Sequence, residues 1–405
     1  MLSAQGGERS VLTTSGYGDV DSRGDGDQSG TGPGGQHSAL VGELPEVESD
    51  RLRLQFIHLP GPSAGSGTDF QFLPGKNKLL VTLRESKIAL LELAERATKV
   101  IVVWDFKEQM LTGDACGPTN LLLDPNFASN QFIYVSYCKD SRTTQLVRYK
   151  FTEETGPISP HVIFETRVAE HELWRRFGSM GFEDSETIWM LVGDHGVPNQ
   201  AQDRSSPLGA LVHISINQAK SDSYGAGDAA NWDSWAYGFR APWRGTRDAA
   251  GRYWIGDVGE QDFEEVNLVT ARGQNFGWDL YTGPCNAGCS GSMSPLVHYD
   301  RSSDHSFIVQ EPKARLEEGR AVWVGQIYQN AAVDRYAGLM NDVVAFGDLF
   351  TGAIRGLRAD PKGKITFHEP IGFLQYVTQW RVGPDGYIYV LDLGGNLHVA
   401  VLARD

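Results

Sequence analysis

The sequence is short of positive charge. Its 405 residues include 36 Lys and Arg against 51 Asp and Glu, which gives a formal net charge of −15. This balance argues against a nucleic-acid-binding protein, which needs a basic surface. No run of about 18 apolar residues is present, so the sequence predicts no membrane span. Helical periodicity is also scarce. The clearest candidate, RVAEHELWRRF at 167–177, is short, and this argues against a doubly wound α/β fold.

The first 50 residues differ from the rest. They are rich in Gly, Ser and Asp, and Tyr17 is their only aromatic residue. Such a segment cannot bury enough apolar surface to offset its ordering entropy, so we predict a disordered tail over 1–50. It also lacks the basic start and apolar core of a secretory signal. Either the protein is not exported by that route, or its natural N-terminus is missing or mispredicted.

One strand pattern recurs along the remaining chain. It consists of β-branched and aromatic residues that end near Asp or Gly, with turn residues on both sides. The copies are NKLLVTLRES from Asn77, NQFIYVSYCKD from Asn130, ETIWMLVGDHG from Glu186, GRYWIGDVGEQ from Gly251, NDVVAFGDLFTG from Asn341 and DGYIYVLDLGGN from Asp385. Six copies over about 350 residues give roughly one unit per 60 residues, which suits a four-stranded propeller blade. We therefore predict an all-β fold, a single six-bladed β-propeller over 51–405.

The four cysteines fall into two pairs, too few for a disulfide-rich scaffold. Cys116 and Cys138 flank a predicted hairpin whose turn, DPNFASN, contains their midpoint, so they are expected within reach of a disulfide. Cys285 and Cys289, in GPCNAGCS, would close a small loop. A zinc site is the alternative, although the spacing is unusual and the pairs lie far apart in sequence. Disulfides would indicate an oxidising compartment.

Four stretches resemble one family, the soluble glucose/sorbosone dehydrogenases, which use pyrroloquinoline quinone (PQQ). They are GPTNLLLDPNFASNQFIYVSY, VGDHGVPNQAQDRSSPLGALVHI, YGFRAPWR with the following YWIGDVGEQDFEEVNLVTARGQNFGWDLYTGPC, and WRVGPDGYIYVLDLGGNL. The resemblance covers nearly everything after residue 51. GPCNAGC is also similar to the hedgehog-interacting-protein-like propellers. The family is six-bladed, in agreement with the repeat count, and it implies a secreted or extracytoplasmic protein.

The resemblance implies a place for the family's chemistry. The family moves two electrons from a sugar C1 hydroxyl to PQQ, with a histidine as base, cations around the PQQ carboxylates and calcium as a Lewis acid. In RRFGSMGF, Arg175 stands at the histidine position, and arginine cannot accept a proton at neutral pH. His171 would replace it only in a remodelled loop.

Most of the family's cofactor-binding cations are missing by the same comparison. Arg240, in YGFRAPWR, matches a PQQ-binding arginine, but Ala241 follows it where the family has asparagine. Phe350 stands at the position of a lysine, and Tyr376 and Thr378 at those of two arginines. Each lost buried contact would cost roughly a few kcal/mol. The resemblance therefore implies a degenerate quinone site.

The calcium loop of the family is better preserved. Its consecutive backbone carbonyls match Gly259 and Glu260, and Glu264 and Glu265 match the acidic pair that follows. Carbonyl and carboxylate oxygens suit calcium; the alternative is a solvated acidic turn. We expect Arg240 and this loop to lie at one end of the central channel and to form the principal ligand site.

Asp194, His195 and Gln200 are further candidates for contact with a substrate. Because adjacent residues of a turn usually point apart, we expect Asp194 to form the turn and His195 to be exposed.

Three functions remain open. The first is a degenerate family member that binds a sugar, a glycan or a protein at the channel mouth, and the lost residues favour it. The second is a PQQ- and calcium-dependent aldose dehydrogenase with a rebuilt site. The third, a calcium-dependent hydrolase, rests on the acidic loop alone.

Overall fold

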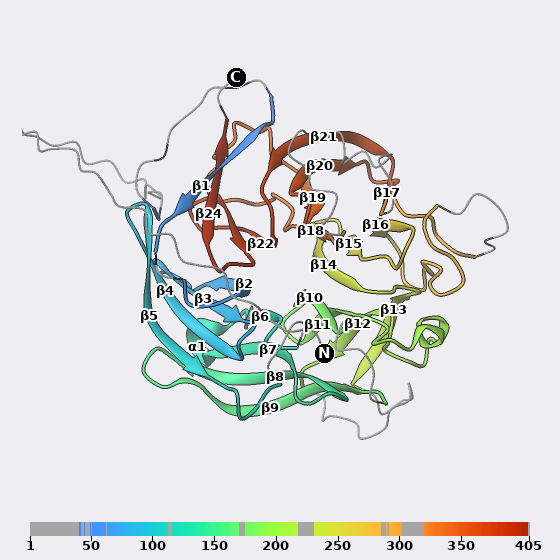
Figure 1. Ribbon diagram of the computed structural model, residues 1–405, viewed down its shortest axis with the longest axis horizontal. Coiled ribbons are helices and arrows are strands. Elements are labelled where there is room, and N and C mark those ends of the chain that lie inside the picture. Colours follow the sequence, from blue (N-terminus) through green and yellow to red (C-terminus); the bar gives the residue numbers. More distant parts are fainter. Residues whose placement is uncertain are drawn as a thin grey trace, which may run out of the picture. The chain divides into compact units, whose positions relative to one another are not determined.

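The chain folds into six four-stranded antiparallel sheets that follow one another around a central axis (Figure 1). The computed structural model describes residues 40–41, 44, 49, 51–61, 63–111, 116–169, 175–217, 231–284, 289, 291–301 and 320–403. Within these ranges the helical elements are one short α-helix, α1 (Phe127–Asn130), and one 3-10 helix, η1 (Pro198–Gln202). The predicted all-β, six-bladed propeller is confirmed.

Each blade is numbered from its innermost strand outwards. Blade 1 contains β2 (Gly67–Phe72), β3 (Lys78–Leu83), β4 (Lys87–Ala94) and β5 (Ala97–Asp105). Blade 2 contains β6 (Asn120–Leu123), β7 (Phe132–Cys138), β8 (Thr143–Thr152) and β9 (Gly156–Arg167). Blade 3 contains β10 (Phe177–Phe182), β11 (Thr187–Val192), β12 (Ala210–Ser215) and β13 (Trp232–Tyr237).

The other three blades follow the same plan. Blade 4 contains β14 (Pro242–Arg247), β15 (Tyr253–Asp257), β16 (Phe263–Val269) and β17 (Val297–Asp300). Blade 5 contains β18 (Val322–Val324), β19 (Val344–Asp348), β20 (Ala353–Ala359) and β21 (Ile365–Phe373). Blade 6 contains β22 (Val377–Val382), β23 (Ile388–Asp392) and β24 (Leu397–Leu402), and its outermost strand is β1 (Leu54–Leu59).

The ring is closed by two distant parts of the chain. Strand β1 pairs antiparallel with β24, so the first described strand completes the last blade. The innermost strands β2 and β22 also contact each other. Val41 and Leu44, inside the stretch predicted as a tail, are buried against the same core. The remaining residues before 51, with the exception of Leu40 and Ser49, lie outside the described ranges.

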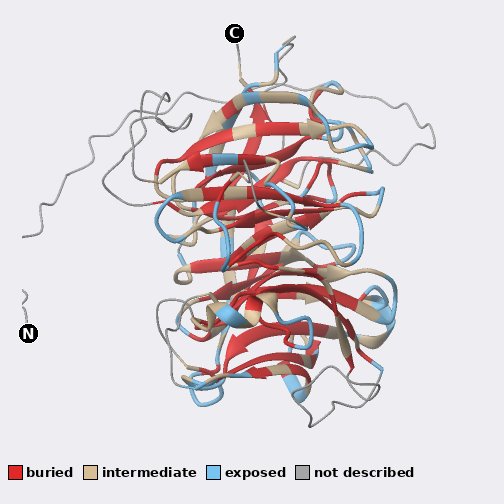
Figure 2. Ribbon diagram, turned by 90° about the vertical axis from the view of Figure 1, so that its right-hand side faces the viewer, coloured by how far each residue is buried: buried red, intermediate tan, exposed pale blue. Residues whose placement is uncertain are grey.

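The second strand of a blade is buried on both faces because each sheet packs between two others. In β3 the five residues Leu79–Leu83 are all buried, and β11 is buried from Ile188 to Val192. Strand β5, on the outer edge of blade 1, instead alternates between partly buried and exposed residues. Figure 2 shows the buried residues running through the sheets and the exposed ones at turns and edges. Each of the six repeated sequence patterns forms the second strand of one blade.

All six innermost strands run away from one end of the channel, which we call the channel mouth. There, the loop that enters a blade's first strand meets the loop that leaves its second strand. In blade 4, Asp257 at the end of β15 accepts hydrogen bonds from the backbone N–H groups of Arg240 (3.0 Å) and Ala241 (2.7 Å). In blade 5, Asp348 accepts one from Ala321 N–H (3.0 Å). In these two blades, the Asp at the end of the second strand therefore fixes the loop that enters the first strand.

The hairpin disulfide is present. Cys116 and Cys138 are bridged, with their Cα atoms 4.9 Å apart, and both are buried. Cys285 lies outside the described residues, so its pairing with Cys289 stays a prediction. The helical candidate at 167–177 begins in β9 and ends in β10, and 170–174 lie outside the described ranges. No helix formed by the described residues is long and apolar enough to cross a membrane.

Removal of the Cys116–Cys138 bridge is expected to lower stability. The bridge closes a loop with a sequence separation of 22, and chain-entropy arguments give such a loop about 3 kcal/mol. We expect the C116S/C138S double variant to melt several degrees below the wild type in differential scanning calorimetry. C285S/C289S is the control and should change the melting temperature less, because the loop that the predicted Cys285–Cys289 bridge would close is much shorter. Equal melting of wild type and C116S/C138S would contradict this expectation.

Candidate functional site at the channel mouth

A cavity of about 580 Å³ opens at the channel mouth, and loops or strand starts from all six blades line it. Its lining is cationic in a protein with a net charge of −15. The lining arginines are Arg84, Arg175, Arg176, Arg240, Arg244 and Arg301. Glu260 is the one acidic residue among the described lining residues. The family resemblance identified Arg175 and Arg240 as residues of the site, but it did not identify the other four arginines.

Arg244 forms part of the cavity floor. It extends from β14 and donates hydrogen bonds to Thr378 O (2.8 Å), Asn120 Oδ1 (2.6 Å) and Thr68 O (2.7 Å), on the innermost strands of three other blades. A longer one goes to Thr119 O (3.3 Å). All four acceptors are uncharged. Burial lowers the pKa of Arg244 to about 10, so the side chain stays charged at neutral pH.

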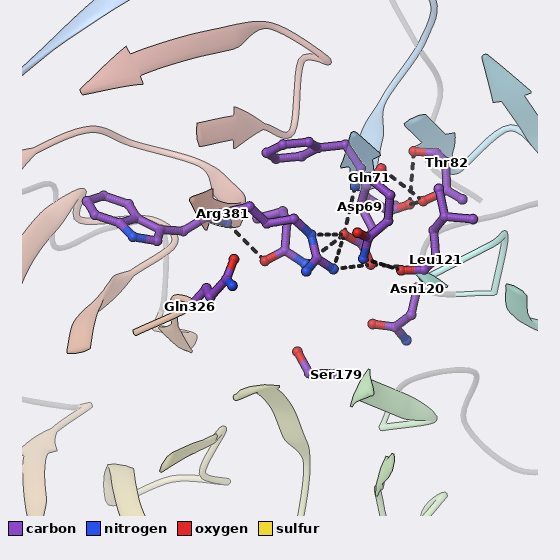
Figure 3. A network of polar contacts seen from close by, with 12 residues as sticks. Asp69, Gln71, Thr82, Asn120, Leu121, Ser179, Gln326 and Arg381 are labelled. Atoms are coloured by element: carbon purple, nitrogen blue, oxygen red, sulfur yellow. Dashed lines mark hydrogen bonds and ion pairs between the residues drawn. The ribbon is translucent and has the colours of Figure 1, made fainter. Parts of the chain in front are cut away.

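Further along the same strands, a largely buried ion pair joins the innermost strands of the neighbouring blades 6 and 1 (Figure 3). Arg381 of β22 donates to both carboxylate oxygens of Asp69 in β2 (2.8 and 3.1 Å), and Gln379 donates to one of them (2.8 Å). Asp69 also accepts the backbone N–H of Leu121 in β6 (2.9 Å). This network spans blades 6, 1 and 2. Since Asp69 is satisfied by Arg381, it is not free to pair with Arg244.

Arg240 is held rigidly on the wall of the cavity. Its Nη1 donates to the backbone carbonyls of Val258 (3.0 Å) and Gly259 (2.7 Å), and its Nη2 lies 3.7 Å from Glu260 Oε1. The guanidinium also stacks over the Trp278 ring, 5.5 Å from its centroid. Its buried Nε has no hydrogen-bond partner among the described residues.

Arg175 and Arg176 occupy the next part of the wall. The Arg175 guanidinium pairs with buried Asp194 (Nε–Oδ1 3.3 Å), which also accepts the Trp278 Nε1–H (2.8 Å). Arg176 Nη1 lies 3.1 Å from His195 Nδ1 and must be the donor of this hydrogen bond, because arginine has no acceptor. The buried Nε of Arg176 has no hydrogen-bond partner among the described residues. Arg176 is only 5% exposed. The two consecutive arginines therefore contact two consecutive buried residues, Asp194 and His195.

Like charges crowd the cavity wall. Burial lowers the pKa of Arg240, and the neighbouring charge of Arg175 lowers it further. The pKa of Arg301 is lowered by burial and then by Arg240. Burial and the charges of Arg176 and Arg175 lower the pKa of His195, which is therefore neutral at pH 7. A bound anion would relieve this repulsion.

Two carboxyl groups, the buried Asp257 and the partly buried Glu265, lie behind Arg240. Asp257 and Glu265 are directly opposite each other on β15 and β16. Burial and then the charge of Glu265 raise the pKa of Asp257 to about 8, and burial raises the pKa of Glu265. The pair therefore carries less negative charge at neutral pH than its composition indicates.

The acidic residues predicted as metal ligands do not meet at one point. Glu264 and Glu265 are consecutive in a strand and point to opposite faces. Glu264 is buried, forms an ion pair with Arg301 and accepts Val322 N–H (2.9 Å). Glu265 accepts Gly283 N–H (2.7 Å) and Asn267 Nδ2–H (3.1 Å). No group of three or more metal-ligating side chains occurs among the described residues.

The predicted substrate residues lie elsewhere. Asp194 and His195 are fully buried behind the cavity wall, so the expectation of an exposed His195 is wrong: its ring lies beneath Arg176 and beside Phe177. Gln200, in η1, lines a separate cavity of about 360 Å³. Arg175, Gly259 and Glu260 line the main cavity, as does Phe350. His171 lies outside the described residues.

Comparison with known proteins places this fold and cavity in a family. Residues 66–399 match the family described as Glucose / Sorbosone dehydrogenase, and the chain belongs to it. It is 21% identical to the aldose sugar dehydrogenase YliI of Escherichia coli over 343 residues (79% of this chain and 85% of the relative). It is 27% identical to the HIPL1 protein of Arabidopsis thaliana over 195 residues, covering 42% of this chain and 27% of the relative. Both resemblances inferred from sequence are confirmed.

A solved structure shows the same fold. The PQQ-bound aldose sugar dehydrogenase of Streptomyces coelicolor superposes with a TM-score of 0.66 at 16% identity, over 86% of this chain and 98% of that chain.

Because the Arg244 guanidinium donates hydrogen bonds to three other blades, its replacement by lysine is expected to lower the stability of the protein strongly. Lysine carries the charge but cannot reach oxygens on three other blades, so Arg244→Lys should leave buried acceptors unpaired. We expect a loss of about 2–4 kcal/mol, measured by chemical denaturation. Arg247→Lys, at the other end of β14 and half-buried, is the matched control and should cost less. Equal stability of the two variants would contradict the role given to Arg244.

The Asp257–Glu265 carboxyl pair predicts a pH dependence of stability. Because its folded pKa values lie above the unfolded ones, its contribution is complete below about pH 4 and is lost as the pH rises towards 8. Glu265→Gln removes one carboxyl group and keeps an acceptor for Gly283 N–H. Its free energy of unfolding relative to wild type should rise by about 1 kcal/mol or more between pH 5 and 8. Glu260→Gln, in the half-exposed mouth loop, is the control; if both differences are flat with pH, the pair does not titrate as described.

Proposed function

We propose that this protein is a binding protein of the glucose/sorbosone dehydrogenase family, whose channel mouth holds an acidic sugar or glycan and no longer performs the family's quinone-dependent oxidation. One observation carries the proposal: among the described residues, six arginines and one acidic residue line a cavity of about 580 Å³. Guanidinium groups bind carboxylates and other oxyanions through paired N–H donors. A cavity of this size suits a small molecule or the end of a larger one.

Two buried donors support an anionic ligand. Arg176 Nε and Arg240 Nε have no acceptor among the described residues, and a buried N–H without an acceptor costs free energy. Both arginines line the cavity. Trp243 and Phe350 also line it and offer apolar faces to a sugar ring.

The loss of oxidation follows from the missing base. Arg175 stands where the resemblance places the base, and its guanidinium is engaged with Asp194. No histidine occurs among the described lining residues. Glu260 lines the cavity, but its carboxylate lies 3.7 Å from Arg240 Nη2 and is paired with that guanidinium.

PQQ-dependent aldose oxidation is the second candidate, because the arginines also suit the carboxylates of PQQ. The cofactor, if bound, would supply the two-electron acceptor. Arg176, Arg240 and Arg244 would hold its carboxylates. The residues do not fit the family's calcium, however, since Gly259 O already accepts a hydrogen bond from Arg240. A calcium-dependent hydrolase has no support from the described side chains.

The buried Cys116–Cys138 bridge supports an extracytoplasmic location. Disulfides persist mainly in oxidising compartments.

Paired ligands test the proposal. Titration calorimetry would compare a galacturonic acid oligosaccharide with the neutral galactose oligosaccharide of equal length. We expect binding of the acidic form only, weakened by added salt because the interaction is electrostatic. Arg240→Gln should reduce the affinity by about 10-fold or more, since a charge-assisted hydrogen bond is worth about 1.5–3 kcal/mol.

Arg247→Gln is the control, because it removes an arginine of the adjoining strand β14 that lies outside the cavity. Absence of binding by the acidic oligosaccharide, or equal binding by the neutral one, would contradict the proposed ligand class. Rapid aldose oxidation in the presence of PQQ, calcium and an artificial electron acceptor would favour the second candidate.

A further inference from the structure

We propose that Arg240 is a built-in cation that takes the place of a metal ion at the channel mouth, so that ligand binding there is independent of calcium. The inference goes beyond the proposed function, because it concerns the charge that holds the mouth loop rather than the ligand. It rests on where the Arg240 guanidinium lies. Two consecutive carbonyls, Val258 O and Gly259 O, converge on its Nη1 at 3.0 and 2.7 Å.

A metal ion and this guanidinium compete for the same space. Calcium binds oxygen ligands at about 2.3–2.6 Å, so an ion on Gly259 O would lie almost where Nη1 now lies. Two cations in contact would repel each other strongly at a partly buried site. Calcium also needs about six to eight oxygens. The two carboxylates that follow this loop, on β16, are engaged elsewhere: Glu264 pairs with Arg301, and Glu265 accepts Gly283 N–H.

The position of Arg240 is fixed on several sides. Asp257 accepts its backbone N–H (3.0 Å), Trp278 packs over its guanidinium at 5.5 Å, and Glu260 lies 3.7 Å from Nη2. These contacts hold the charge in place without an ion. The unpartnered Nε of Arg240 remains as a donor for an oxyanion. The side chain therefore joins the two loops of blade 4 and presents positive charge to the cavity, as a bound metal would.

Truncation of Arg240 should uncover the carbonyls. In Arg240→Ala, Val258 O, Gly259 O and the Glu260 carboxylate lose their cation and become available to calcium. We expect the wild-type melting temperature to change by less than about 1 °C between 5 mM calcium and 5 mM EDTA, and that of Arg240→Ala to rise by about 2–4 °C with calcium. Arg175→Ala is the matched control: it removes a cavity arginine that contacts Asp194 instead of these carbonyls, and it should stay insensitive to calcium.

Terbium luminescence gives a second readout that does not depend on stability. Trp278 lies beside the Arg240 guanidinium, so a terbium ion in its place would be sensitised by tryptophan excitation. We expect calcium-displaceable emission from Arg240→Ala and none from the wild type or Arg175→Ala. Emission from wild type that calcium displaces, or a calcium-induced rise in its melting temperature, would overturn the inference. So would a folded Arg240→Ala variant that shows neither response. Sugar binding plays no part in these measurements, so failure of the proposed ligand class would leave their outcome unchanged.

Discussion

The central interaction of this propeller is the buried guanidinium of Arg244 on the channel axis. A charge taken out of water is costly unless its donors are satisfied, and here four oxygens on the other blades accept them. The same contacts connect blade 4 to blades 1, 2 and 6 across the channel. The Asp69–Arg381 pair lies further along the strands and is electrically balanced. Arg244 is not balanced by a hydrogen-bonded carboxylate, so closing the ring also places positive charge on the floor of the cavity.

The rest of the mouth adds to this charge. Four more arginines line it: Arg175, Arg176, Arg240 and Arg301. The groups that contact them from behind are a neutral imidazole and carboxyl groups that are already paired or that carry a raised pKa. His195 is neutral, burial raises the pKa of Asp194 and of Asp257, and Glu264 is consumed by Arg301. The lining of the cavity is therefore positive, although the chain as a whole has a formal net charge of −15. A concave site of one sign attracts ligands of the other.

The sequence predicted the fold well because blade packing leaves a local signature. Each second strand is largely buried on both faces, five of the six end near Asp or Gly, and the six copies of the pattern are the second strands of the six blades. The hairpin disulfide followed from the same register. The site was predicted less completely. Comparison by motif identified missing cations at Phe350 and Thr378, but Arg84, Arg176, Arg244 and Arg301 gather only when the ring closes. These four arginines all lie at or near the end of a strand at the channel mouth, and this shared position could have predicted that they meet. His195 has a left-handed backbone conformation (φ 54°), which could not be predicted from the sequence GDHG, and neither could the burial of its ring.

The most direct test of this account is a crystal of the full chain soaked in bromide, with data collected at the bromine absorption edge. Bromide reports positive potential without requiring knowledge of the natural ligand. The account predicts that the strongest anomalous peak lies in the cavity, within hydrogen-bonding distance of Arg176, Arg240 or Arg244. A cavity without a bromide peak, in a crystal whose outer surface shows several, would contradict the claim that the channel mouth is an anion site.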